Sequence, residues 1–355
     1  MVSFISFVIV IGICVLVHEY GHYITARLLG VQVHEFALGM GPVIIKKETS
    51  ARNPGRQDNL MTWSWRLFPV GGFCRIAGMG EDEEGETVIA GMGFNEQSAW
   101  KRFLILLDGS LNNVILALLL TAFFLYGHGY LKMDDTQIGE IMEGFPAASA
   151  GLVKGDRIIQ VGDKSVSEWR EMSSALRSSA AANSDVALVI ERDGKKFDLK
   201  ITIPVSKEHG YPMLGVTPIL ERYTASGAIQ NAAGYTWRMT IMMYRAIWDW
   251  ITQKEEMDVT GPIGIASMSG RAMRDGVWSF AAFLAMISLN LGLLNLLPIP
   301  ALDGGRILFV VFEMILRRRL PERVENWIHT AGFVLLIALM VFVTWQDIYR
   351  LFFVE

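Results

Sequence analysis

The residue types with the clearest chemical potential are two histidines and a glutamate near the N-terminus. They lie in the segment His18-Glu19-Tyr20-Gly21-His22, and an α-helix turns once in about 3.6 residues, so both imidazoles project from nearly the same face. Histidines with this spacing can share one Zn²⁺, and Glu19 could act as general base toward a water molecule. The alternative is a chance match to a short pattern, with both histidines as ordinary helix residues.

The residues before this segment are apolar. No charged side chain occurs from Met1 to Val17, so the motif lies in a predicted membrane span, where an ionisable group costs roughly 2.5–3.5 kcal/mol and is functional by default. The chain has 355 residues, 52% of them hydrophobic, and a positive mean hydropathy, which makes it more apolar than typical soluble proteins. Its net charge of −4 gives no indication of nucleic-acid binding.

Four apolar segments are long enough to cross a bilayer, because a spanning helix needs about 20 residues. They are residues 2–24, 103–126, 280–297 and 328–343. The basic segment 317–323 is expected in the cytoplasm by the positive-inside rule. We therefore expect both termini and the region 130–275 outside, with the histidine motif near the cytoplasmic side.

A third metal ligand is needed, because three protein ligands and a water molecule usually complete a catalytic zinc site. The favoured candidate is Asp303, in a segment that reads NLLPIPALDGGR from Asn295 to Arg306, where two prolines and a glycine pair break the helix. Broken backbone at membrane depth is tolerated only where it is buried or lines a wet cavity, and a carboxylate there needs a cation. As an alternative, Asp303 caps a helix end with Arg306 as its partner. The other histidines and acids considered as ligands are His34, Glu35 and His329, of which His329 is expected at the membrane interface.

The pair HEYGH and NLLPIPALDGGR resembles the two signatures of the site-2 protease family, which are intramembrane zinc metalloproteases. This resemblance implies zinc on His18, His22 and Asp303, with Glu19 as general base. It also implies that Asn295 binds the substrate backbone near the metal. The implied setting is the bacterial inner (cytoplasmic) membrane, where the lipid bilayer surrounds the enzyme. The implied activity is regulated intramembrane proteolysis of single-pass membrane proteins, such as anti-sigma factors, or of remnant signal peptides.

Two further segments fit the family. Residues 69–78 resemble a membrane-associated β-hairpin whose edge strand, with Gly71, Gly72 and Phe73, would bind an extended substrate by main-chain hydrogen bonds. An ordinary surface turn before the acidic run 81–86 is the alternative. Within 109–113, the sequence resembles the family pattern Gly-Pro-x-x-Asn with serine in place of proline, so that Asn113 is expected to contact the active-site helices. Asp108, just before this pattern, has no explanation from the sequence.

The region outside the membrane contains more charge and shorter apolar runs. Residues 145–159 resemble the core signature of bacterial, circularly permuted PDZ domains, which implies an inserted α+β domain. The segment with Leu214, Gly215 and Val216 resembles the loop that captures a peptide C-terminus. Either this groove binds a trimmed substrate end, or the domain acts as a size filter.

The prediction is a polytopic α-helical membrane protein with four transmembrane helices, an inserted PDZ domain and a membrane-associated β-hairpin. Residues 1–130 form the N-terminal membrane region, 131–218 the PDZ domain, 219–274 an amphipathic helix and linker, and 275–355 the C-terminal membrane region. The charges within 225–253 favour a helix lying on the outer membrane face over a fifth span. The predicted function is that of a zinc metalloendopeptidase. The rival hypotheses are a non-catalytic PDZ scaffold with a vestigial zinc site, which the intact Glu19 disfavours, and a zinc transporter.

Overall fold

The computed structural model describes residues 2–50, 60–80, 87–182, 185–205, 210–252, 260–319 and 321–353, so the acidic run 81–86 lies outside the described residues. The chain divides into two compact units. One unit combines Met1–Phe124 with Ala228–Glu355, and the other is Leu125–Gly227. The second unit is continuous in sequence, whereas the first combines two separate stretches of the chain.

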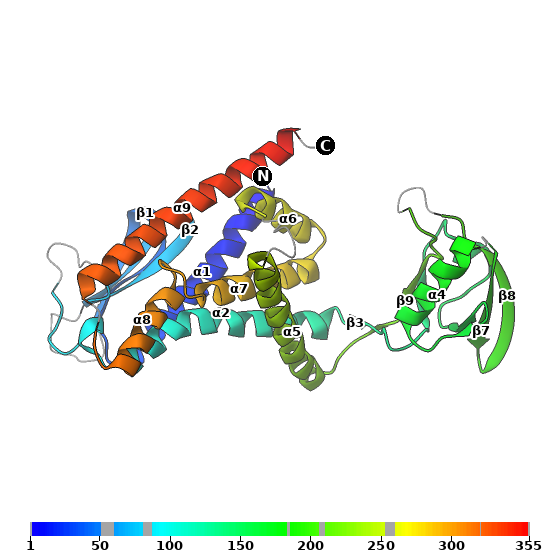
Figure 1. Ribbon diagram of the computed structural model, residues 1–355, viewed down its shortest axis with the longest axis horizontal. Helices are drawn as coiled ribbons and strands as arrows, with labels where there is room; N and C mark the ends of the chain where they lie inside the picture. Colours follow the sequence, from blue (N-terminus) through cyan, green and yellow to red (C-terminus); the bar gives the residue numbers. More distant parts are fainter. Residues whose placement is uncertain are drawn as a thin grey trace. The chain divides into compact units, whose positions relative to one another are not determined.

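Four helices of the first unit are long and apolar enough to cross a membrane, among the residues that the structure describes. They are α1 (Val2–Leu28), α2 (Ala99–Gly127), α7 (Val277–Asn295) and α9 (Glu322–Phe353) (Figure 1). Each apolar run predicts a helix because lipid leaves no partner for unpaired backbone groups. The expectation of four candidate spans is confirmed.

The backbones of these helices approach closely because small residues lie where they cross. Gly21 of α1 lies against the carbonyl group of Asp108 in α2, and a Cβ at Gly292 of α7 would come within 2.8 Å of the Ser110 carbonyl oxygen in α2. The Ser288 hydroxyl of α7 donates to the Asn113 carbonyl oxygen at 2.9 Å. Close crossing of α1, α2 and α7 brings their side chains into one site.

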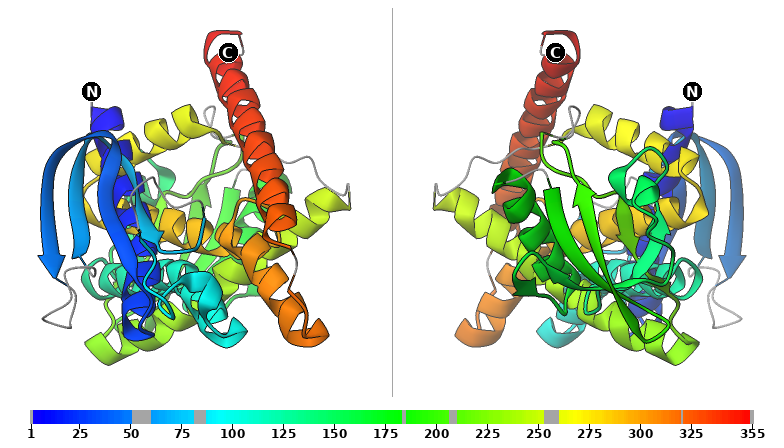
Figure 2. Two further views of the ribbon diagram at one scale, coloured as in Figure 1. Left: turned by 90° about the vertical axis from the view of Figure 1, so that its left-hand side faces the viewer. Right: turned by 90° about the vertical axis from the view of Figure 1, so that its right-hand side faces the viewer.

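A pair of long antiparallel strands, β1 (Val33–Ser50) and β2 (Leu60–Ile76), lies beside α1 (Figure 2). Residues 33–38 of β1 pair with residues 72–76 of β2 on one side and with residues 62–65 on the other. Residues 72–76 are therefore an edge, with a paired strand on one side among the described residues. The segment 69–76 lies within a strand, so the surface-turn alternative is wrong there.

Among its described residues, the first unit also contains the helices α5 (Ala225–Ile251), α6 (Pro262–Arg274) and α8 (Asp303–Leu316) and a short 3₁₀ helix, Phe94–Glu96. The helix expected at 225–253 is present as α5, and Met243 on it packs against Ala117 of α2 and Leu289 and Leu293 of α7. The Tyr244 hydroxyl also lies 3.4 Å from the Leu293 carbonyl oxygen, to which it donates. This contact with two candidate spans was not expected from the sequence.

The described part of the second unit contains short strands and two helices. Its four-stranded sheet has the order β6-β5-β7-β8, and two further strand pairs are β4 with β9 and β3 with β10. The elements are β3 (Tyr130–Leu131), β4 (Ile138–Ile141), α3 (Pro146–Ser149), β5 (Arg157–Val161), β6 (Lys164–Ser165), α4 (Trp169–Ala182), β7 (Asp185–Arg192), β8 (Lys195–Thr202), β9 (Val216–Pro218) and β10 (Leu220–Glu221). Asp193 and Gly194, both with positive φ, make the tight turn between β7 and β8. An apolar core that includes Ile158, Met172 and Leu188 lies between α4 and the sheet.

Candidate active site

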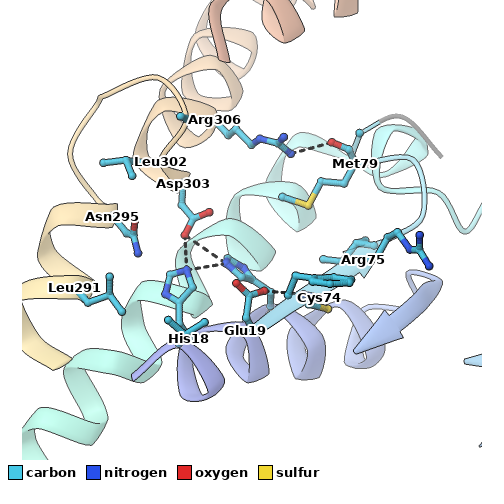
Figure 3. A pocket seen from close by; sticks show the side chains of 16 residues that line it. His18, Glu19, Cys74, Arg75, Met79, Leu291, Asn295, Leu302, Asp303 and Arg306 are labelled. Carbon is cyan, nitrogen blue, oxygen red and sulfur yellow. Dashed lines mark hydrogen bonds and ion pairs between the residues drawn. The ribbon is translucent and has the colours of Figure 1, made fainter. Parts of the chain in front are cut away.

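A pocket of about 490 Å³ lies where α1, β2, α7 and the start of α8 meet (Figure 3). His18 and Glu19 reach it from α1, Asn295 from the end of α7, and Asp303 from the first residue of α8. The pocket is also lined by Val15, His22, Phe73, Cys74, Arg75, Ile76, Met79, Gly80, Leu291, Ala301, Leu302 and Arg306. Residues separated by almost 300 positions in the sequence therefore share one cavity.

Three potential metal ligands converge in this pocket. The Asp303 Oδ2 atom lies 3.0 Å from His18 Nε2 and 3.3 Å from His22 Nε2, and the two Nε2 atoms are 3.2 Å apart. Bonds of about 2.0–2.1 Å from zinc to tetrahedral ligands place neighbouring ligand atoms about 3.3 Å apart, so the three separations fit one zinc ion. The donor set of two imidazoles and a carboxylate also suits zinc. The alternative of two ordinary helix histidines does not explain why a buried carboxylate meets both.

The rings of both histidines are oriented by their second nitrogen. His22 Nδ1 lies 2.8 Å from the Ile105 carbonyl oxygen, which can only accept, so the proton is on Nδ1 and Nε2 is free for a metal. His18 Nδ1 faces the side-chain amide of Asn113 at 3.4 Å, and Asn113 Oδ1 is buried without a partner among the described residues. A 180° rotation of that amide places Oδ1 next to His18 Nδ1. Oδ1 then accepts the Nδ1 proton, which leaves Nε2 of His18 unprotonated for a metal. The expected contact of Asn113 with the active-site helices is present.

Gly109 of α2 also shapes the site, because it has no side chain where α2 meets the His22 ring. A Cβ at Gly109 would overlap the His22 ring, so only glycine leaves room for that ring against α2. The neighbouring Asp108 accepts a hydrogen bond from the Thr25 hydroxyl of α1 at 2.5 Å. Asp108, which the sequence left unexplained, therefore joins α1 to α2 beside the histidines.

The carboxylate of Glu19 faces the edge strand of β2. Its Oε2 accepts a hydrogen bond from the backbone N–H of Cys74 at 2.8 Å. Since Cys74 pairs with Phe36 on its other side, this N–H points outward from the edge at 72–76. The second oxygen, Oε1, makes no hydrogen bond to any residue that the structure describes.

The other acids and bases considered from the sequence lie elsewhere. Arg306 donates to the Met79 carbonyl oxygen at 2.8 Å, so the hypothesis that it is the partner of Asp303 is not supported. Glu35 is held by Arg66 at 2.7 Å and by Arg75 at 2.8 Å, which leaves it no free position for a metal.

Some predicted site residues are brought together and others are not. Phe73 and Asn295 line the pocket, whereas Gly71 and Gly72 lie in the adjoining strand outside its lining. Leu214, Gly215 and Val216 line a different cavity, of about 200 Å³, in the second unit. That cavity also includes apolar side chains of α4, namely Trp169, Met172 and Leu176.

Several groups around the site could not be predicted from the sequence. His329 is buried, and its Nδ1 accepts a hydrogen bond from the backbone N–H of Ala301 in the loop before Asp303. The carbonyl group of Ile105 and the N–H of Cys74 are backbone groups, which leave no signal in a sequence. Gly109 could have been suspected from its helical surroundings, where a glycine is unfavourable without a packing reason.

Comparison with known proteins identifies the family. The model of peptidase family M50 matches residues 6–339. The chain belongs to peptidase family M50, the site-2 proteases. A Rickettsia conorii protein named as a zinc metalloprotease is 32% identical over 99% of this chain and 100% of its own length. The Enterococcus faecalis protein named as protease Eep is 30% identical, over 99% of this chain and 100% of its own length.

Among solved structures, the PDZ domain of an SdrC-like protein from Listeria monocytogenes matches with a TM-score of 0.21 and 20% identity. The match covers 25% of this chain and 93% of that domain.

Membership of family M50 and the four candidate membrane helices define the activity. The protein is an intramembrane zinc metalloprotease, a hydrolase that cleaves peptide bonds with a zinc cofactor. The converging nitrogen and oxygen atoms on α1 and α8 fit that cofactor. The predicted family, enzyme class and cofactor are confirmed.

Proposed function

We propose that His18, His22 and Asp303 bind the catalytic zinc and that Glu19 is the general base, for cleavage within or near transmembrane segments of substrates. The observation that carries this proposal is the trio of ligand atoms at separations of 3.0, 3.2 and 3.3 Å. The Glu19 carboxylate in the same pocket supplies the base that a purely structural metal site does not need. The scaffold alternative, with a vestigial zinc site, gains no support from this arrangement.

In the proposed hydrolysis, Glu19 and the Cys74 N–H have separate roles. When bound, zinc supplies a Lewis acid that polarises the scissile carbonyl and lowers the pKa of the attacking water. Glu19 Oε1 takes a proton from that water and later delivers it to the leaving amine. The Cys74 N–H holds Oε2 at 2.8 Å, which orients the carboxylate so that Oε1 faces the reaction.

The substrate backbone is proposed to bind along the edge of β2. A transmembrane helix resists hydrolysis because its amides are already hydrogen-bonded, so it must unwind first. Residues 72–76 offer the open edge of β2 to an extended peptide, which would pair with outward backbone groups other than the Cys74 N–H that Glu19 holds, and Phe73 lines the pocket. The side-chain amide of Asn295 makes no hydrogen bond within the described part of the chain, and it is available to the peptide near the metal ligands.

Exposed apolar side chains within residues 40–45 of β1 and 65–68 of β2 support membrane association of the β1–β2 pair. Apolar side chains there are about half exposed, which is unfavourable in water and suits a lipid environment. They include Met40, Ile44, Ile45, Trp65, Leu67 and Phe68. We propose that this part of the pair enters the bilayer and places the edge strand at the depth of the substrate helix.

The proposed location is the bacterial inner membrane, with the active site near the cytoplasmic side. Exposed Arg317, Arg318 and Arg319 follow α8, which begins at the site. By the positive-inside rule this end of the protein faces the cytoplasm. The termini and the second unit are then extracytoplasmic, and the substrates are single-pass membrane proteins or signal peptides.

We propose that the second unit is a PDZ domain whose groove receives a peptide C-terminus. The cavity between α4 and residues 211–216 is lined by Leu214, Gly215 and Val216 together with apolar side chains of α4. A concave cavity with both apolar and polar side chains in its lining suits an apolar terminal residue with its carboxylate. The size-filter hypothesis predicts instead that blocking this cavity leaves cleavage unchanged.

The test uses the full-length protein in detergent with a transmembrane test substrate. Glu19→Gln is expected to retain zinc and the melting temperature but to abolish cleavage. Asp303→Asn is expected to lower the zinc content, whereas Asp275→Asn, which changes an exposed carboxylate at the end of α6, leaves it unchanged. Wild-type cleavage by the Glu19 variant would refute the base, and full zinc occupancy in the Asp303 variant would refute the ligand.

A further inference from the structure

His329 lies near the start of α9 and is neither a proposed zinc ligand nor the proposed base. It nevertheless makes a polar contact inside the protein. Its side chain is buried, with 9% exposed, and its Nδ1 accepts a hydrogen bond from the Ala301 N–H at 3.0 Å. A ring nitrogen that accepts an N–H carries no proton, so the neutral ring has its proton on Nε2. Nε2 is buried and has no partner among the described residues. A leucine would fill similar space without burying an unpartnered N–H. What the histidine adds is therefore the hydrogen-bond acceptor Nδ1.

The backbone that His329 holds is in an unfavourable conformation. Ala301 has φ of +76°, in the left-handed region that residues with a Cβ rarely adopt. Such a residue persists only where its surroundings determine its conformation. Two contacts from α9 do so, because His329 binds the Ala301 N–H and Gly332, one turn later, packs so closely on Pro300 that it has no room for a Cβ.

This turn leads directly to Asp303. The residue between them, Leu302, is the N-cap of α8 and provides no side-chain hydrogen bond to the first turn of the helix. The start of α8 therefore depends on the backbone before it. Asp303 Oδ2 must lie close to its position 3.0 Å from His18 Nε2, since zinc sites tolerate deviations of only about 0.2 Å in ligand distance.

We propose that His329 is a positioning residue for the third zinc ligand. Its unprotonated Nδ1 fixes the left-handed turn at Ala301, and this turn presents the Asp303 carboxylate to the two histidines of α1. The inference rests on the proposed assignment of Asp303 as a ligand. It also means that α9, which contributes no ligand itself, controls zinc affinity through its contact with the loop.

The experiment compares three substitutions of His329 in the full-length protein. Zinc affinity is measured by competition with a chelator of known affinity, and kcat and KM are measured on a transmembrane test substrate at saturating zinc. His329→Leu is expected to weaken zinc binding by about 10–100-fold, the usual effect of losing a group that orients a ligand. kcat is expected to fall with KM little changed, because the substrate-binding edge of β2 is not affected.

Two amide variants separate positioning from packing. In His329→Asn the side-chain oxygen occupies the place of Nδ1 and can accept the Ala301 N–H, so zinc affinity is expected to recover. In His329→Gln the amide reaches the place of Nε2 instead, and no recovery is expected. The melting temperatures of the zinc-free proteins show whether a variant has lost its fold rather than its zinc ligand.

The variant Ala301→Gly provides an independent test. Glycine adopts a positive φ without strain, so the turn then needs His329 less, and His329→Leu should weaken zinc binding less in this background than in the wild type. Equal zinc affinity of the Asn and Gln variants, or wild-type affinity of His329→Leu, would overturn the proposal. If Asp303→Asn leaves zinc affinity unchanged, the ligand assignment fails; if Asp303→Asn weakens binding and His329→Leu does not, only the positioning role fails.

Discussion

The substitution Gly109→Ala tests whether close contact between α2 and α1 positions the His22 ring. An added Cβ would overlap the Nε2 and Cε1 atoms of His22 and lie 2.9 Å from its Cδ2. Ordinary carbon contacts are about 3.5–4.0 Å, so the ring or the helix must move by roughly 1 Å. The ring cannot rotate away without losing its hydrogen bond to the Ile105 carbonyl oxygen at 2.8 Å.

The expected effect is large on activity and small on secondary structure. Displacement of a catalytic group by about 1 Å can cost on the order of 100-fold in rate, so turnover is expected to fall by about that factor with weaker zinc binding. Alanine favours helix by about 1 kcal/mol over glycine, which partly offsets an overpacking cost of about 1–3 kcal/mol. The protein should therefore remain folded.

The assay combines turnover of a transmembrane substrate with zinc content by elemental analysis and with thermal unfolding. Gly12→Ala is the matched control, because it lies in α1 with His22 and its nearest neighbour, the Pro69 carbonyl oxygen, is 3.9 Å from the added Cβ. It should retain wild-type turnover. A Gly109 variant with full zinc content and turnover within about threefold of the wild type would refute the packing argument.

Two other predictions concern interactions away from the zinc site. Asp347 of α9 accepts the backbone N–H groups of Gly261 at 3.1 Å, Ile263 at 3.1 Å and Gly264 at 3.0 Å, so Asp347→Ala should cost about 0.5–2 kcal/mol, as for a lost helix cap. Faster amide exchange at the first turn of α6 would show it, and unchanged exchange would contradict it. In the second unit, burial raises the pKa of Asp156, but hydrogen bonds from Arg192 and from the Val153 N–H outweigh it and hold the pKa below its usual value. Asp156 therefore contributes stability above its unfolded pKa of about 3.9 that is lost as the pH falls through the folded value. Arg192→Met should destabilise this unit by about 2 kcal/mol at pH 7, less than for a fully buried pair because Arg192 is partly exposed, and the difference should shrink below about pH 4. Urea unfolding at the two pH values measures this, and a difference independent of pH would exclude the carboxylate as its source.

Local patterns in the sequence are enough to predict the metal chemistry and the membrane environment. The spacing of His18 and His22 is a local property of a helix, so it predicts a shared metal without any tertiary information. Apolar runs of about 20 residues predict the four candidate spans for the same reason, since each run meets the bilayer as an independent helix. Asp303 was found because prolines, glycines and a carboxylate in an apolar segment conflict with ordinary helix.

The groups that position these side chains become visible in the three-dimensional fold. The contacts of His22 with Gly109, of Glu19 with the Cys74 N–H, and of His329 with Ala301 join segments that are between 28 and 87 residues apart. Such contacts depend on how helices cross and on where backbone groups point, and neither is encoded in a local pattern. A histidine near the start of an apolar helix is equally compatible with the membrane interface and with a buried contact. The fold places it against the loop before Asp303, the proposed third zinc ligand.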